Sequence, residues 1–275
     1  WKVVKARKLF GMICEHAWAT GDPGLVFLDR MELDNPTPSL GKLEATNPCG
    51  EIALLPYESC NLSSICLQNH LKKTSKGYEI DWEDLEKTVK LGVRFLDDMI
   101  EVNTYALREI EEMVKQGNRR IGLGVMGFAH MLYILEIAYD SPEAVRLAER
   151  LSKFMRKKAE EESLRLGQER GPFPNFDISV FAGTSERYRN CALTMIAPTG
   201  TISMMANCSS GIEPAFSLVT KRRTFFEDDD ANRPTREFLM VDRVFEEWLK
   251  KTVKSEQRRN EILERVAETN SLVEV

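Results

Sequence analysis

Three side chains capable of radical or acid–base chemistry stand on alternate residues of one short segment. Asn47, Cys49 and Glu51 supply an amide, a thiol and a carboxylate, with Pro48 and Gly50 between them. Alternate side chains of an extended backbone share one face, and Pro48 biases Asn47 towards that conformation. Gly50 allows another chain or a ligand to approach the backbone closely. The segment therefore predicts a face that holds a small polar molecule while the thiol, or a radical derived from it, reacts.

A second thiol, Cys60, precedes an apolar run at residues 62–67 that predicts a buried strand. A thiol at this position could deliver electrons and protons to the same small molecule. Each cysteine also has a simpler interpretation as a small buried hydrophobe, and the spacing of Asn47, Cys49 and Glu51 is by itself a weak signal. These residues alone leave both interpretations open.

A hydroxyl-rich turn follows a short apolar run at residues 193–196 that predicts a strand. The residues of the turn are Pro198, Thr199, Gly200, Thr201, Ile202 and Ser203. Backbone N–H groups in such a turn, together with the Thr and Ser hydroxyls, can form a concave site for a phosphate or a diphosphate. An ordinary connection between a strand and a helix explains the same residues equally well. The turn is not the P-loop of nucleoside triphosphatases, because no Gly-Lys-Ser/Thr sequence follows it.

Residues 122–127 match the glycine pattern of dinucleotide-binding folds, G-x-G-x-x-G. That pattern requires a strand immediately before the first glycine. Residues 115–120 are instead polar and typical of a turn. We therefore expect these glycines to permit close backbone packing and not to bind a nicotinamide or flavin dinucleotide.

The composition argues against several functional classes. The 38 basic and 43 acidic residues among 275 are interspersed, with a formal net charge of -5, so we expect no basic face for a nucleic-acid polymer. No apolar run approaches the roughly 20 residues of a membrane helix, and no signal peptide is evident, so we predict a cytoplasmic protein without a membrane partner. The six cysteines form no C-x-x-C pair and the three histidines share no ligand spacing, so neither a disulfide framework nor a metal site is expected.

Hydrophobic periodicity predicts one helix-rich α/β unit over residues 1–275, without internal repeats or a clear linker. Asp81 can cap one long helix and Ser141 another, with Pro142 in its first turn. The expected elements are a helix over 1–20, a stop at 21–24, a strand over 25–28, a loop over 35–50, a polar turn over 72–77, a helix over 81–118 that is continuous or has one break, a helix over 141–167, an acidic loop over 227–230 and an amphipathic helical tail over 237–268.

Taken together and in this order, the motifs resemble the catalytic subunit of ribonucleotide reductase. The resemblance rests on residues 21–24, 47–51, 60–64, 119–124 and 197–214. Asn-Pro-Cys-Gly-Glu, Pro-Thr-Gly-Thr-Ile-Ser and Cys-Ser-Ser-Gly-Ile-Glu-Pro are most similar to the adenosylcobalamin-dependent class. The alternative, the di-iron class, usually has different residues between the shared Asn, Cys and Glu, and a phosphate loop of Pro-Thr-Ala-Ser type. The resemblance implies an α/β fold in which this chain forms the finger loop and the second half of a ten-stranded barrel.

The resemblance also implies a role for each candidate residue. Cys49 would become a thiyl radical after homolysis of the cobalt–carbon bond of adenosylcobalamin, and would abstract the 3′ hydrogen of a ribonucleotide. Glu51 would accept the proton of the 3′ hydroxyl, Asn47 would bind the ribose hydroxyls, and Cys60 would be one of two reducing thiols. The whole loop at residues 47–51 would contact substrate, and the turn at residues 198–203 would bind its diphosphate or triphosphate.

The chain also departs from the family pattern. In the family the partner of Cys60 lies far upstream, and Cys14 is too close to the finger to take that place. A C-terminal cysteine pair and the N-terminal region that reads the allosteric nucleotide are missing, and the first residue is Trp1, which suggests a fragment. We therefore expect a need for a complementary polypeptide or a homodimer, with an external dithiol such as thioredoxin as reductant. A noncatalytic nucleotide-binding remnant, which would not depend on Cys49, is the more distant alternative.

Overall fold

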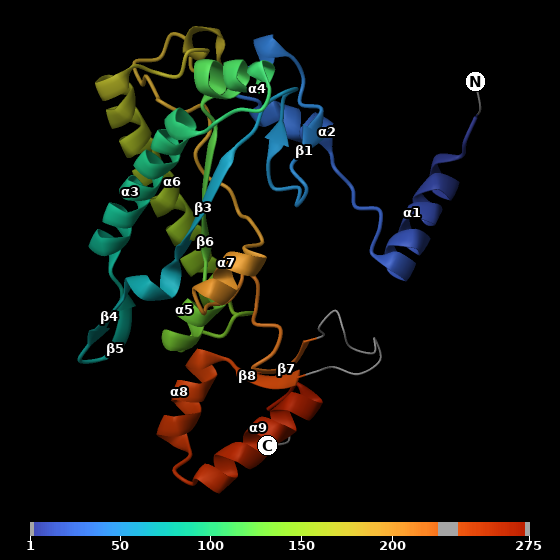
Figure 1. Cartoon of the computed structure of the whole chain (residues 1–275), viewed down its shortest axis with the longest axis vertical. Coiled ribbons are helices and arrows are strands. Elements are labelled where there is room, and N and C mark those ends of the chain that lie inside the picture. The colour runs from blue at the N-terminus through green and yellow to red at the C-terminus, as the bar shows by residue number, and fades with distance from the viewer. Residues whose placement is uncertain (1–2, 225–235, 273–275) are drawn as a thin grey trace.

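Two parallel strands run through the middle of the molecule (Figure 1). The computed structural model describes residues 3–224 and 236–272. Strands β3 (Asn61–Cys66) and β6 (Ile121–Met126) pair from Asn61 with Ile121 to Cys66 with Met126. On the other side of β6, the N–H of Leu123 donates to the carbonyl of Leu193 at 2.8 Å, and an isolated parallel bridge joins Leu123 to Thr194. The apolar runs at 62–66 and 193–196 are thus extended on opposite sides of β6, although the second forms only a bridge and the first ends at Cys66, one residue before its expected end.

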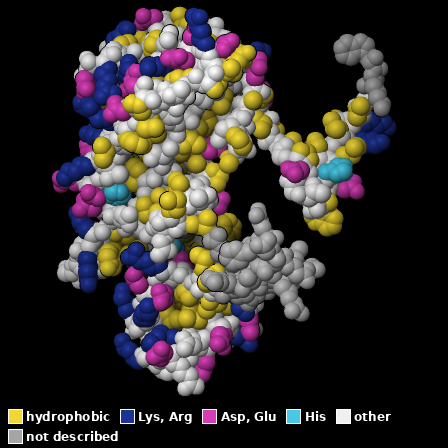
Figure 2. All heavy atoms as spheres, in the orientation of Figure 1, with side chains coloured by type: hydrophobic (Ala, Val, Ile, Leu, Met, Phe, Trp, Pro, Cys, Tyr) yellow, Lys and Arg dark blue, Asp and Glu magenta, His cyan; other side chains and the backbone are white. Residues whose placement is uncertain are grey.

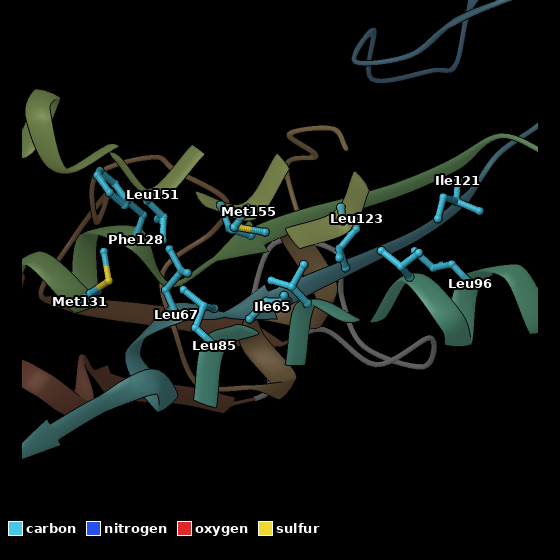
Figure 3. Close-up of a cluster of buried hydrophobic side chains, with 14 of the residues drawn as sticks. Ile65, Leu67, Leu85, Leu96, Ile121, Leu123, Phe128, Met131, Leu151 and Met155 are labelled. Carbon is cyan, nitrogen blue, oxygen red and sulfur yellow. The ribbon is translucent and has the colours of Figure 1, made fainter. Parts of the chain in front are cut away.

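Two long helices cover this strand pair and enclose the main core (Figure 3). Helix α3 (Trp82–Val102) packs on β3 and β6, and helix α6 (Pro142–Arg170) packs on α3. The expected caps are confirmed, since the side chain of Asp81 accepts from the N–H of Asp84 at 3.2 Å and that of Ser141 from Ala144 at 3.1 Å. The apolar stripe of α3 is at most 1% exposed and consists of Leu85, Val89, Val93, Leu96 and Ile100. Burial of each such side chain contributes about 1.5–3 kcal/mol, which fixes α3 against the strands.

The other elements surround this core. The sheets among the described residues each have two strands, so no closed barrel forms within them, but the fold is α/β and helix-rich as expected. The remaining helices and strands are α1 (Ala6–Thr20), α2 (Leu28–Met31), β1 (Ala45–Thr46), β2 (Ala53–Leu54), β4 (Leu71–Thr74), β5 (Gly77–Ile80), α4 (Arg108–Met113), α5 (Phe128–Ile134), α7 (Gly200–Met205), β7 (Val219–Thr224), β8 (Arg236–Val241), α8 (Arg243–Thr252) and α9 (Glu256–Thr269).

Three expectations for local structure are wrong. Residues 25–27 form no strand and are exposed, and helix α2 begins at Leu28, because this apolar run has no partner strand among the described residues. The polar turn at 72–77 is the hairpin of β4 and β5, with the turn only at its tip. Residues 236–241 form β8, which pairs with β7, and helices begin only at Arg243. A helical pattern was overridden there by antiparallel pairing with β7, the preceding strand of the chain. The acidic loop at 227–230 lies outside the described residues.

The glycine pattern at residues 122–127 lies within and directly after β6, and no strand precedes it. A Cβ atom on Gly124 would lie 2.7 Å from the carbonyl oxygen of Met195, and one on Gly122 would lie 2.7 Å from the Met195 side chain. The glycines therefore permit the segment around Met195 to lie directly against β6. The expectation of close backbone packing is confirmed.

Helix α1 stands apart from the rest of the molecule (Figures 1 and 2). None of its residues is buried, and Leu9, Phe10 and Trp18 are exposed apolar side chains. Residues 219–272, as far as they are described, form a separate small core at the opposite end from α4. Among the helices of the described residues, none combines the length and the apolar character that crossing a membrane requires.

Candidate functional site

The hairpin of β1 and β2 carries the predicted finger loop. The N–H of Asn47 donates to the carbonyl of Ile52 at 3.1 Å, and the N–H of Ile52 donates to Oδ1 of Asn47 at 3.0 Å. The N–H of Gly50 donates to the carbonyl of Asn47 at 3.0 Å, and Gly50 has a φ of 87°. The backbone therefore reverses at residues 48–50. The expectation that Asn47, Cys49 and Glu51 share one face of an extended segment is wrong, because this loop turns back on itself.

Two of the predicted catalytic side chains, Glu51 and Cys60, line one cavity of about 220 Å³. Cys60 also packs on Ile52 and Met195 in a small apolar cluster, so the base of the hairpin contacts the segment that leads to the 198–203 turn. Oε2 of Glu51 is buried and has no hydrogen-bond partner among the described residues. The structure thus brings the carboxylate and the second thiol together at a cavity with an unsatisfied acceptor.

Cys49 and the turn at residues 198–203 have other surroundings. Cys49 is exposed at the loop tip and is not among the residues that line this cavity. Gly200 and Ser203 line a different cavity, of about 680 Å³. Met195, at the first cavity, lies three positions before Pro198 in the chain, and these three steps span at most about 11 Å. The turn therefore lies within reach of a ligand that extends out of the first cavity.

Arg120 is a site residue that the sequence interpretation missed. The strand register pairs Asn61 with Ile121, so Cys60 and Arg120 precede the paired strands at the same end. Nε of Arg120 donates to Oε1 of Glu58 at 3.0 Å, and Oε1 also accepts from Asn118 at 2.8 Å. The NH2 group of Arg120 is buried and, like Oε2 of Glu51, lacks a partner among the described residues. Buried polar atoms are normally hydrogen-bonded, so the cavity offers a donor and an acceptor to a polar ligand.

The surroundings of Cys60 keep its thiol protonated. Burial raises the pKa of Cys60 to about 12, although the charge of Arg120 acts in the opposite direction. The Cys60 thiol donates to the carbonyl of Asn61 at 3.4 Å. Burial likewise raises the pKa of Cys191 to about 12. At neutral pH Cys60 is therefore a hydrogen donor and not a thiolate nucleophile.

The two candidate cysteines should differ strongly in alkylation rate. We expect iodoacetamide at pH 8 to modify the exposed Cys49 at least about tenfold faster than Cys60, because alkylation requires an accessible thiolate and burial suppresses that form at Cys60. Mass spectrometry of peptides after timed quenching measures both rates, with the exposed Cys14 as the reference for an accessible thiol. Equal rates at Cys49 and Cys60 would contradict this arrangement.

The turn at residues 198–203 is held by its own hydroxyls. Oγ1 of Thr199 accepts from the N–H of Gly211 at 2.7 Å, and the hydroxyl of Ser203 lies 2.9 Å from that of Ser210. Thr199 has a φ of 58°, and helix α7 begins at the next residue. We expected these two hydroxyls to help bind a phosphate. They instead contact residues 210 and 211 of the loop that follows α7. Thr201 is exposed, and the first N–H groups of α7 have no acceptor within the helix.

Comparison with known proteins identifies the family. The family model of the ribonucleotide reductase barrel domain matches residues 1–186 and 183–275. The chain belongs to the ribonucleotide reductase barrel-domain family. This agrees with the resemblance of its motifs and with the α/β fold, although the described strands do not close a barrel.

The similar curated reductases carry two kinds of name. A vitamin B12-dependent ribonucleoside-diphosphate reductase of Mycobacterium tuberculosis is 51% identical over 79% of this chain and 30% of its own length. One of Thermoplasma acidophilum is 42% identical over 100% of this chain and 34% of its own length. The ribonucleoside-diphosphate reductase subunit alpha of Chlamydia trachomatis is 31% identical over 78% of this chain and 24% of its own length. The chain thus spans about a third or less of the reductases that it matches.

Proposed function

We propose that this chain supplies the finger loop and part of the substrate site of an adenosylcobalamin-dependent ribonucleotide reductase, which converts ribonucleoside di- or triphosphates to deoxyribonucleotides. The observation that carries the proposal is the cavity where Glu51, Cys60 and Arg120 meet, with a carboxylate oxygen and a guanidinium nitrogen that both lack hydrogen-bond partners within the described part of the chain. Two relatives named as vitamin B12-dependent, at 51% and 42% identity, are more similar to this chain than the Chlamydia trachomatis subunit alpha at 31%, which favours that class over the di-iron class.

Each proposed role follows from the chemistry of the side chain. Cys49, as a thiyl radical, would abstract the 3′ hydrogen of the ribose, and Glu51 would accept the 3′ hydroxyl proton. Asn47 would bind a ribose hydroxyl through its amide nitrogen, since Oδ1 already accepts from Ile52. Cys60, which keeps its proton at neutral pH, would donate as the 2′ hydroxyl leaves as water. Its oxidation to a disulfide requires a second thiol, which the family places on a segment upstream.

The loop tip is compatible with the bulky cofactor. A Cβ atom on Gly50 would have no other atom within 4 Å, and the neighbouring Cys49 is exposed, so a large group can approach this thiol. The described residues contain no group of three or more His, Cys, Asp or Glu arranged to hold a metal ion. A corrin ring brings its own ligands to cobalt, so no such group is needed. When bound, adenosylcobalamin supplies the radical, and the protein positions and shields it.

The proposed partners follow from the same reaction. Each turnover oxidises two thiols, so an external dithiol such as thioredoxin must reduce the resulting disulfide. The turn at residues 198–203 would hold the phosphates of the ribonucleotide with its backbone N–H groups and the hydroxyl of Thr201. A complementary polypeptide or a second copy of the chain is the further partner that we propose for the active assembly.

A chimera tests the proposal. This chain replaces the matching region of the Thermoplasma acidophilum reductase, and formation of deoxyribonucleotides is measured with dithiothreitol, with and without adenosylcobalamin. We expect turnover only with the cofactor. A folded chimera that binds nucleotide but gives no product would contradict the proposal, whereas cofactor-independent turnover with a di-iron partner subunit would assign the di-iron class. The chain alone is expected to be inactive, and brisk turnover by it would contradict the need for a complementary polypeptide.

A further inference from the structure

Two cysteines that the proposed reaction does not use meet at the carboxyl ends of the parallel strands. Cys66 is the last residue of β3, and Cys208 lies in the loop after α7. A Cβ atom on Gly127 would lie 3.6 Å from Sγ of each of them. Since each sulfur lies 3.6 Å from that one point, the two are at most 7.2 Å apart, which is twice 3.6 Å. The two sulfur atoms are therefore neighbours beside a glycine that has no side chain to separate them.

The backbone around this cysteine pair is already held in place. The N–H of Gly127 donates to the carbonyl of Ser209 at 2.7 Å. The side-chain amide of Gln68 donates to the carbonyl of Asn207 at 3.3 Å. These bonds fix the loop around Cys208 to the ends of β3 and β6. Rotation of the two side chains is therefore the main movement that an S–S bond requires.

The two thiols differ in acidity. The hydrogen bond from Cys208 lowers the pKa of Cys66 to about 7, against the opposing effect of its partial burial, and the N–H of Asn69 and the charge of His130 act in the same direction as Cys208. The same hydrogen bond raises the pKa of Cys208. Cys66 is thus partly thiolate at neutral pH, whereas Cys208 keeps its proton.

Small molecules can reach this cysteine pair. Both residues are half-buried, and Cys208 lines the cavity of about 680 Å³ that also contacts Gly200 and Ser203. An oxidant in this cavity would meet the pair beside the turn at residues 198–203. A covalent link there would tie the end of β3 to the loop that follows this turn.

We propose that Cys66 and Cys208 form a reversible disulfide by exchange with an oxidised small-molecule disulfide of the glutathione type. The Cys66 thiolate attacks one sulfur of that molecule, which forms a mixed disulfide and releases one thiolate. Cys208 then gives its proton to solvent or to the released thiolate and attacks Sγ of Cys66, which releases the second small thiol. In sum, two cysteine thiols are oxidised and one small disulfide is reduced to two thiols. This inference does not depend on the reductase activity.

The test uses the 275-residue chain without substitution. The protein is equilibrated anaerobically at pH 7 with several ratios of reduced to oxidised glutathione, quenched with acid and alkylated, and its cysteine peptides are identified by mass spectrometry. We expect a Cys66–Cys208 cross-linked peptide that grows with the oxidised fraction and disappears in excess reduced glutathione, while the exposed Cys14 and Cys49 carry only mixed disulfides. Free Cys66 and Cys208 at every ratio, or pairing of either with another cysteine, would overturn the proposal.

Two variants separate the roles of the pair. In Cys208→Ala we expect a glutathione mixed disulfide to persist on Cys66, and alkylation of Cys66 at pH 7 to slow by about tenfold as its pKa returns towards an ordinary cysteine value. An unchanged alkylation rate would refute the activation of Cys66 by Cys208. The matched control is Cys191→Ala, which removes a buried thiol near Arg120 and should leave the Cys66–Cys208 bond unaffected.

Discussion

Replacement of Cys49 by serine in the chimeric reductase is expected to reduce deoxyribonucleotide formation by more than about 1,000-fold, which corresponds to about 4 kcal/mol of activation free energy. A hydroxyl holds its hydrogen much more strongly than a thiol does, so Cys49→Ser removes the group proposed to carry the radical. The loop itself is held by bonds between Asn47, Gly50 and Ile52, and Cys49 is exposed, so folding should be unaffected. Product formation and nucleotide binding by calorimetry are the two measurements.

The matched control for this variant is Cys14→Ser, which removes another exposed thiol from a helix that lies apart from the site. It should retain full turnover. Retained turnover in Cys49→Ser would remove Cys49 from the radical role. If the chimera with Cys49 intact has no turnover but binds nucleotide normally, the result would instead support the noncatalytic alternative.

Features that depend on neighbours in sequence could be predicted from the residues alone. Asp81 and Ser141 cap their helices because a side chain of this type reaches an N–H only a few residues away. The apolar stripe of α3 follows from helical periodicity in the same way. The motif at residues 47–51 could also be recognised from the sequence. The resemblance to the family depends on the types and order of these residues and not on the directions of their side chains.

Features that depend on strand register could not be predicted in this way. Arg120 lies beside Cys60 because Asn61 pairs with Ile121. The polar residues at 115–120 do not indicate that pairing. The sequence did contain one signal of a site residue at this position, because Arg120 is a charged residue directly before a buried strand. Cys66 and Cys208 likewise lie close together only because the loop after α7 packs against the carboxyl ends of β3 and β6.

The finger loop shows a second limit of prediction from sequence. Proline at position 48 favours an extended Asn47, but the fold of residues 48–50 is decided by hydrogen bonds between Asn47 and Ile52 across the hairpin. The reversal separates the exposed Cys49 from Glu51, which faces the cavity. In the proposed enzyme, the radical would therefore form at the accessible tip, and the substrate would have to extend from Cys49 to the carboxylate of Glu51.

A buried carboxylate on α3 holds the segment that presents Arg120. Asp97 is 0% exposed and accepts from Arg119 at 2.8 and 3.1 Å, and from Asn190 at 3.0 Å. Arg170 and Arg189 also reach it, at 3.1 and 3.3 Å. Asp97 thereby joins α3, the residue before Arg120, the end of α6 and the residues before Cys191. Loss of this carboxylate would leave the guanidinium of Arg119, only 1% exposed, with fewer acceptors.

Asp97→Ala is therefore expected to lower the free energy of unfolding by about 3–5 kcal/mol, measured by urea denaturation at pH 7, because the buried Arg119 loses its fully buried carboxylate partner and keeps the part-exposed Glu101. The matched control is Asp98→Ala, which removes a half-exposed carboxylate that also binds Arg170. The loss should be less than about 1 kcal/mol.

The contribution of Asp97 to stability should depend on pH. Burial acts to raise the pKa of Asp97, but Arg119 and Arg189 hold it below the usual value. The stabilisation is thus fully present above the unfolded-state pKa of about 3.9 and is lost as pH falls through the lower folded-state pKa. The difference between wild type and Asp97→Ala should accordingly shrink below about pH 4, and a difference that stayed constant down to pH 2 would show that the carboxylate charge is not its source.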